Sequence, residues 1–141
     1  MKEVHILLVE DNEGDIVLTL DAFEESKIKT RISVVKNGAD ALDFLFKRGD
    51  YIEKDRPDLI LLDINIPVYN GHDVLKKIKG DPSLRTIPVI MLTTSASQND
   101  INKAYENYSN SYVTKPIDMN DFLRAILKIE QFWLQLSKLA K

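Results

Sequence analysis

Four short apolar runs in this 141-residue chain end in polar or charged residues of kinds that could do chemistry. Glu10 and Asp11 follow Leu-Leu-Val, and Asp63 follows Leu-Ile-Leu-Leu. Further along, Thr93 ends a third run and Lys115 follows a fourth. Carboxylates, a hydroxyl and an ammonium group could together bind a hard cation and a phosphoryl group, provided that the fold brings them to one place.

The charges of this set predict what it binds. Two carboxylates about 4 Å apart repel each other by about 4 kcal/mol at an effective dielectric constant of roughly 20. Glu10, Asp11 and Asp63 therefore need a cation, and Lys115 supplies only one positive charge. Mg²⁺ suits such oxygen ligands. An oxygen of Asp63 could then attack a phosphoryl group, with the metal and Lys115 neutralising its oxygens and Thr93 donating a hydrogen bond.

The apolar runs are typical of buried parallel strands, because they are short, mostly β-branched or Leu, and bounded by charged or turn residues. Segments of helical periodicity separate them. Strand alternating with helix five times predicts an α/β fold, a doubly wound (βα)5 arrangement with a five-stranded parallel sheet. The predicted strands are 4–9, 31–35, 59–62, 88–93 and 111–114, and the predicted helices are 14–27, 38–47, 71–79, 97–108 and 119 to about 139.

This arrangement would bring the polar residues together, since ligands of open parallel sheets bind beyond the carboxyl ends of the strands. Each residue alone also has an ordinary explanation. Asp11 could cap a helix, Thr93 could be a strand residue, and Lys115 could belong to a proline turn. Asp63 is harder to explain in this way, because a charge at the rim of a central strand needs a partner. The agreement of all four strand ends favours a functional site.

The same residues resemble the receiver domain of two-component response regulators, over essentially the whole chain. The matching segments are Leu-Val-Glu-Asp-Asn at 8–12, Asp-Leu-Ile-Leu-Leu-Asp-Ile-Asn at 58–65, Asn-Gly at 70–71, Pro-Val-Ile-Met-Leu-Thr at 88–93 and Tyr-Val-Thr-Lys-Pro at 112–116. The resemblance implies a flavodoxin-like, CheY-like fold. It also implies that Asp63 accepts phosphate from a sensor histidine kinase or a phosphotransfer protein.

The resemblance also implies roles for the neighbouring residues. Glu10, Asp11, Asp63 and the backbone carbonyl of Asn65 match the family's Mg²⁺ site, and Lys115 matches the lysine that pairs with the phosphate. Thr93 and Tyr112 match its switch pair. Phosphate on the aspartate would draw the hydroxyl of Thr93 inward, and Tyr112 would fill the space. Such a protein is not an enzyme beyond Mg²⁺-dependent self-phosphorylation and autodephosphorylation.

Within the family, the chain is most similar to the stand-alone phytochrome-associated regulators of cyanobacteria and their relatives. The similarity rests on Val-Glu-Asp-Asn-Glu-Gly-Asp at 9–15, the charged loop before Pro57, and Glu-Gln-Phe-Trp-Leu at 130–134. Two positions depart from the usual pattern. Asn-Tyr-Ser-Asn at 107–110 replaces small residues before the fifth strand, and Thr94 stands where many receivers have Ala, at a position that controls access to the phosphate.

The last predicted helix has a second apolar stripe beyond the residues needed to pack it on the sheet, which are Ile117, Met119, Phe122, Leu123, Ile126 and Leu127. The steps of this stripe are four, three, four and three, as in the seam between two helices. We therefore expect a C2 homodimer through the fourth and last helices and the fifth strand. The alternative is a tail that folds over its own domain or frays. The stripe consists of Ala125, Ile129, Phe132, Leu136 and Leu139.

Length and composition limit the function. A chain of 16.1 kDa with 44% apolar residues predicts one receiver domain over residues 1–141 without an output domain. The absence of cysteine excludes thiol chemistry and cysteine zinc sites. A net charge of −3 argues against direct nucleic-acid binding. Apolar stretches far shorter than a membrane span predict a cytoplasmic protein without membrane contact.

Other functions that use a similar fold fit these residues less well than phosphate acceptance does. A haloacid dehalogenase-type phosphatase needs a second Asp where Asn65 stands, and a flavin module needs a phosphate-binding loop where this chain is acidic. The remaining alternative is an adaptor that works without phosphorylation. We expect a phosphoacceptor that signals through contact with a downstream protein whose identity is unknown. His5 and His72 are expected at the surface or in turns.

Overall fold

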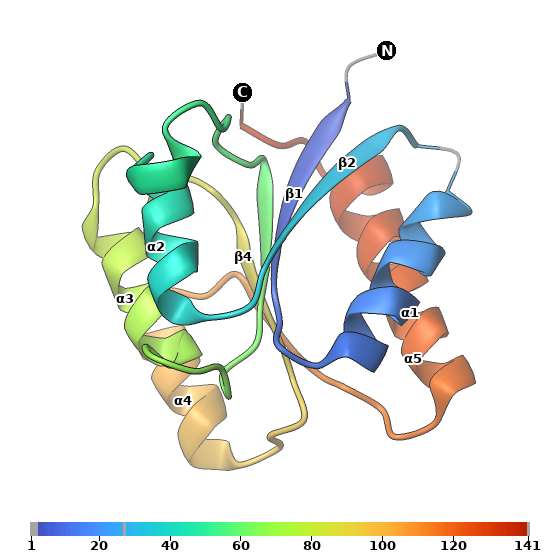
Figure 1. The fold of residues 1–141 in the computed structure, drawn as a ribbon. Helices are drawn as coiled ribbons and strands as arrows, with labels where there is room; N and C mark the ends of the chain where they lie inside the picture. Colours follow the sequence, from blue (N-terminus) through green and yellow to red (C-terminus); the bar gives the residue numbers. More distant parts are fainter. Residues whose placement is uncertain (1–2, 27, 141) are drawn as a thin grey trace.

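The computed structural model describes residues 3–26 and 28–140. Five parallel strands form one sheet in the order β2-β1-β3-β4-β5. Helices cover both faces of this sheet (Figure 1), which confirms the predicted doubly wound α/β fold. The strands are β1 (Val4–Val9), β2 (Thr30–Val35), β3 (Leu59–Leu62), β4 (Val89–Thr93) and β5 (Ser111–Thr114).

The helices begin where the sequence provides side-chain caps. Each α-helix starts after an Asn, Ser or Asp whose side chain accepts a hydrogen bond from the backbone N–H three residues later, which satisfies a donor that the helix leaves free. Helices α1 and α5 lie on one face of the sheet, and α2, α3 and α4 lie on the other (Figure 1). Their bounds are α1 (Glu13–Glu24), α2 (Gly38–Leu45), α3 (Gly71–Gly80), α4 (Gln98–Glu106) and α5 (Met119–Glu130).

The core lies in two layers because strand side chains alternate between the faces of the sheet. Leu7 and Leu62 pack with α2 and α3 residues, whereas Leu8 and Leu61 pack with residues of α1 and α5. All four residues of β3 are buried, as expected for a central strand covered on both faces. No helix in the described part of the chain is long and apolar enough to span a bilayer.

The register of the sheet brings the ends of the strands to one edge. Val9 of β1 pairs with Leu62 of β3, and Leu62 pairs with Met91 of β4. Thr93 pairs with Thr114 of β5. The residues that follow these positions therefore lie beyond the same edge, as the argument from strand order predicted.

The C-terminal part of the chain differs from the prediction. Helix α5 ends at Glu130 and continues as a π-helical segment, Gln131–Leu136, so the helical extension is shorter than the expected end near residue 139. The residues of α5 that are buried against the sheet and α1 are Phe122, Ile126 and Ile129. The expectation that Ile117, Met119 and Leu127 also pack there is wrong, because all three are exposed.

The predicted second stripe is therefore not continuous. Ile129 belongs to the protein's own core, and Ala125 is half-buried. Phe132 is 53% exposed, while Leu139 is half-buried and lies beyond the helical segment. The side chain of Leu136 is outside the described residues. The wider π-helical turn departs from the 3.5-residue repeat after Glu130.

The two histidines also differ from the prediction, since each is only 4% exposed. His5 lies in β1, where its Nε2 is 2.8 Å from Oγ of Ser33 in β2. His72 lies in the first turn of α3, and its Nε2 is 2.9 Å from Oδ1 of Asp100 in α4. Both side chains face neighbouring elements rather than solvent, which a single sequence position does not indicate.

The unusual segment before β5 has a structural role. Helix α4 ends at Glu106, and Tyr108 adopts a positive φ of 68° with its side chain exposed. The side-chain oxygen of Asn110 accepts hydrogen bonds from the backbone N–H of Val89 and from Nζ of Lys79. These polar residues thus tie the start of β4 to the segment that leads into β5.

Candidate functional site

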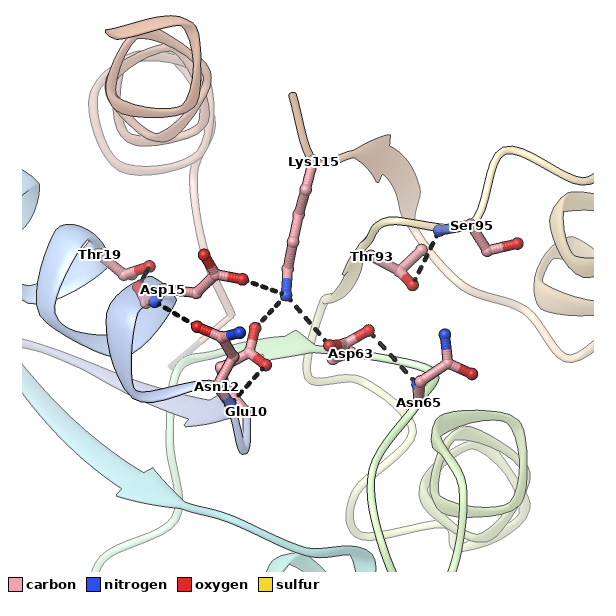
Figure 2. Close-up of polar contacts among 9 residues, drawn as sticks. All are labelled: Glu10, Asn12, Asp15, Thr19, Asp63, Asn65, Thr93, Ser95 and Lys115. Carbon is pink, nitrogen blue, oxygen red and sulfur yellow. Dashed lines mark hydrogen bonds and ion pairs between the residues drawn. The ribbon is translucent and has the colours of Figure 1, made fainter. Parts of the chain in front are cut away.

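A buried lysine is the centre of the polar cluster at the carboxyl edge of the sheet. Lys115 follows β5, and its Nζ contacts three carboxylates (Figure 2). It lies 3.1 Å from Oδ2 of Asp63 after β3 and 3.0 Å from Oδ2 of Asp15 in α1, and it also bonds Oε1 of Glu10 after β1. The side chains of Lys115 and Glu10 are each 3% exposed, and that of Asp63 is 9% exposed.

Burial and charge shift the pKa values of this cluster. Burial raises the pKa of Glu10 to about 7, with Asp63 adding to the rise and Lys115 opposing it. Burial would lower the pKa of Lys115, but its hydrogen bond to Glu10 and the charges of Asp63 and Glu10 raise the value above the usual range. Lys115 therefore stays charged, but its single positive charge does not balance the negative charges of the carboxylates in the cluster.

The donor atoms fit a hard divalent cation. Glu10, Asp11 and Asp63 each offer a carboxylate oxygen, and these oxygens lie within 4.8 Å of one another. With Asp15, the cluster holds four carboxylates and one ammonium, so a cation of charge two would relieve the repulsion between the carboxylates. Asp11 is exposed, so the cluster opens to solvent on that side. Oxygen ligands of this kind suit Mg²⁺.

The backbone of Asn65 lies beside the carboxylate of Asp63. Its backbone N–H donates a long hydrogen bond of 3.4 Å to Oδ1 of Asp63 (Figure 2). The backbone here leaves no room for a side chain at Gly71, where a Cβ atom would lie 2.2 Å from the backbone oxygen of Asp63. Glycine at the start of α3 therefore lets the chain pass directly behind the candidate phosphoacceptor.

Thr93 and Tyr112 meet at one loop residue, Ser95. Thr93 is fully buried, and its Oγ1 accepts a hydrogen bond of 3.4 Å from the backbone N–H of Ser95. The hydroxyl of Tyr112 donates to the backbone oxygen of Ser95 at 2.8 Å, and its ring packs against the core. The predicted switch pair is thus connected through the loop after β4. Thr94 is exposed beside it.

Two contacts of the site were missed in the sequence. Asp15 is not among the predicted site residues, although it follows Asp11 by four residues and the start of α1 faces the site. The structure shows that Asn12 caps the helix and that the side chain of Asp15 contacts Lys115. Asp100 was not considered, yet it binds both Ser95 and His72.

The sequence matches a family model and two named relatives over most of its length. A model of the response regulator receiver domain matches residues 6–127. The chain is 40% identical over 130 residues to the response regulator Rcp1 of Synechocystis sp., covering 92% of this chain and 88% of that protein. It is 41% identical over 129 residues to the probable methanogenesis regulatory protein FilR2 of Methanothrix harundinacea, covering 92% and 83%.

Solved structures of response regulators have the same fold as this chain. The phosphorylated cyanobacterial phytochrome response regulator RcpA superposes with a TM-score of 0.97 at 38% identity, over 99% of this chain and 100% of that one. The Mn²⁺-bound form of Rcp1 gives a TM-score of 0.96 at 38% identity, over 98% and 99%. The predicted similarity to phytochrome-associated regulators is confirmed, and this chain belongs to the family of response regulator receiver domains.

Proposed function

We propose that the protein is a response regulator that accepts a phosphoryl group on Asp63 from a sensor histidine kinase or a phosphotransfer protein. The main support is the position of the Asp63 carboxylate, which contacts the ammonium of Lys115 and lies close to the carboxylates of Glu10 and Asp11. One Asp63 oxygen would attack phosphorus while the P–N bond to the donor's histidine breaks. The leaving imidazole takes up a proton, and an acyl phosphate forms.

The neighbouring residues would assist this transfer without changing covalently. Glu10, Asp11, Asp63 and the backbone carbonyl of Asn65 would hold Mg²⁺, which when bound supplies positive charge to the phosphoryl oxygens. Lys115 would pair with a phosphoryl oxygen. Thr93 would donate its hydroxyl hydrogen to the new phosphate. The chemistry would be limited to the protein's own phosphorylation and dephosphorylation.

The switch would pass through Ser95. Donation of the Thr93 hydroxyl hydrogen to the phosphate would draw this side chain inward and lengthen the hydrogen bond that its oxygen accepts from the backbone N–H of Ser95. The loop would then shift, and Tyr112, whose hydroxyl binds the same residue, would shift with it. A population shift of this kind changes the surface formed by α4, β5 and α5.

We further propose that the receiver signals through its own surface to an unidentified downstream protein. A homodimer would use the β5–α5 face, which we define by Ser111, Val113, Ala125, Lys128 and Phe132. The exposed ring of Phe132 beside a strand edge supports this choice. The similarity to Rcp1 and RcpA supports a phytochrome as the kinase. Because such kinases draw phosphate from ATP, we place the protein in the cytoplasm.

Phosphorylation can be tested directly by mass spectrometry. Incubation with phosphoramidate and Mg²⁺ should add about 80 Da to the protein, and the adduct should be labile in base. Asp63→Asn should abolish the adduct, whereas Asp21→Asn, which changes an exposed carboxylate of α1, should not. An unmodified wild-type protein would favour the alternative of an adaptor that works without phosphorylation.

A further inference from the structure

The ammonium of Lys115 has no donor to spare in this structure. An ammonium group has three N–H donors. Three carboxylates, those of Glu10, Asp15 and Asp63, accept hydrogen bonds from Nζ (Figure 2). Each donor therefore has a partner already, before any phosphoryl group arrives.

Phosphoryl transfer to Asp63 would require one of these three contacts to break. Glu10 is almost fully buried and belongs to the proposed metal site, and Asp63 would bear the phosphate itself. Asp15 is different, because its side chain is 26% exposed and water can solvate the carboxylate once it leaves the lysine. Releasing this contact costs the least desolvation, since the other two carboxylates would remain buried.

We propose that Asp15 is a positioning residue that holds Lys115 in the unphosphorylated protein and competes with the phosphoryl group for its ammonium. This inference rests on the proposed phosphorylation of Asp63. It predicts that removing the charge of Asp15 makes the site bind a phosphoryl group more tightly. In the unphosphorylated protein, Asp15 would keep Lys115 in place and make the site less responsive to small phosphate donors.

The start of α1 does not depend on the side chain of Asp15. Its backbone N–H donates to the capping side chain of Asn12 at 2.9 Å, and its backbone oxygen accepts from the hydroxyl of Thr19 at 2.7 Å. Asp15→Asn keeps both backbone contacts, so the helix should form as before. The effect of the substitution can thus be measured in a folded protein.

Glu13 provides a matched control in the same helical turn. Its carboxylate bonds Nζ of Lys36 rather than Lys115, and it is exposed. Glu13→Gln removes one negative charge near the site without changing the partners of Lys115. A difference between Asp15→Asn and Glu13→Gln therefore measures the contact with Lys115 and not the loss of a charge from this end of α1.

The test measures the affinity of beryllofluoride, a phosphoryl analogue, in saturating Mg²⁺, and the concentration of phosphoramidate that gives half the maximal phosphorylation rate. Asp15→Asn should tighten beryllofluoride binding and lower the half-saturating phosphoramidate concentration, each by about fivefold, as expected for a partly exposed ion pair. Glu13→Gln should leave both unchanged. Equal values for the two variants would overturn the inference, whereas a wild-type protein that binds neither reagent would instead overturn the proposed function.

A second background separates the lysine contact from a general effect of charge. With Lys115→Met, phosphorylation by phosphoramidate is followed by mass over hours. Adding Asp15→Asn to this variant should not lower the half-saturating concentration further, because no ammonium remains to be released. An equal gain in both backgrounds would show that Asp15 repels the phosphate directly and would contradict a role through Lys115.

Discussion

His72 in α3 and Asp100 in α4 share a hydrogen bond of 2.9 Å, with the histidine almost fully buried. Asp100 also accepts a hydrogen bond of 2.6 Å from the hydroxyl of Ser95. The backbone oxygen of Ser95 is the partner of Tyr112. A continuous set of polar contacts therefore leads from α3 through α4 to the predicted switch tyrosine, and it fixes the loop after β4.

Asp100→Asn should loosen this loop. The substitution weakens the hydrogen bonds to Ser95 and His72, which together also hold the pKa of Asp100 below its usual value. We expect a loss of about 1–2 kcal/mol in the free energy of unfolding and faster amide hydrogen exchange at residues 94–97. Urea unfolding and exchange mass spectrometry would measure both. Asp73→Asn, which changes an exposed side chain in the first turn of α3, should change neither. Unchanged exchange in the Asp100 variant would contradict this role.

His5 should contribute a loss of stability in mild acid. Burial and the nearby charge of Arg31 lower the pKa of His5 below its usual value of 6.5, so the folded state resists protonation of this residue more than the unfolded state does. The contribution of His5 to the free energy of unfolding should therefore decrease as the pH falls below about 6.5, opposite in sign to that of Glu10, whose raised pKa favours the folded state as the pH falls. Urea unfolding of the wild type and of His5→Gln at several pH values would show the His5 contribution as the difference between the two profiles. His5→Gln should remove part of the pH dependence, and an identical profile in that variant would argue against it.

Gly71→Ala should destabilise the protein and distort the site. The added Cβ would lie 2.2 Å from the backbone oxygen of Asp63, so the backbone of β3 or α3 has to move. We expect a loss of about 2–3 kcal/mol in the free energy of unfolding and slower phosphorylation. Gly80→Ala, at the other end of the same helix, meets no atom within 4 Å and should be neutral or slightly stabilising. Equal effects of the two substitutions would contradict the steric explanation.

Phe132→Ser should weaken the proposed dimer with little loss of stability. The ring is 53% exposed, and the substitution removes apolar area from the β5–α5 face rather than from the core. Light scattering at tens of micromolar, with and without beryllofluoride, would compare the mass with that of the wild type. Ile129→Ala serves as the contrast, because it should destabilise the fold itself by about 2–4 kcal/mol. A monomeric wild-type protein in both conditions would exclude the dimer.

The sequence predicted the fold and most of the site well because both depend on local patterns. Each strand is a short apolar run, and each helix follows a capping residue, so the five repeating units could be read from the order of residues alone. The polar residues after β1, β3, β4 and β5 then had to meet, since all parallel strands end at one edge. Residues such as Glu10, Asp63 and Lys115 lie together for this reason.

The tertiary structure decided which side chains make contact across long distances in the chain. Asp15 reaches Lys115 only because α1 packs beside α5 on the same face of the sheet, and His72 reaches Asp100 only because α3 and α4 are neighbours. The π-helical segment after Glu130 likewise ended the regular repeat of the last helix, and the packing of α5 on the sheet put Ile129 into the core. Periodicity in the sequence determines that a helix has an apolar face, but the packing of neighbouring elements determines what that face covers.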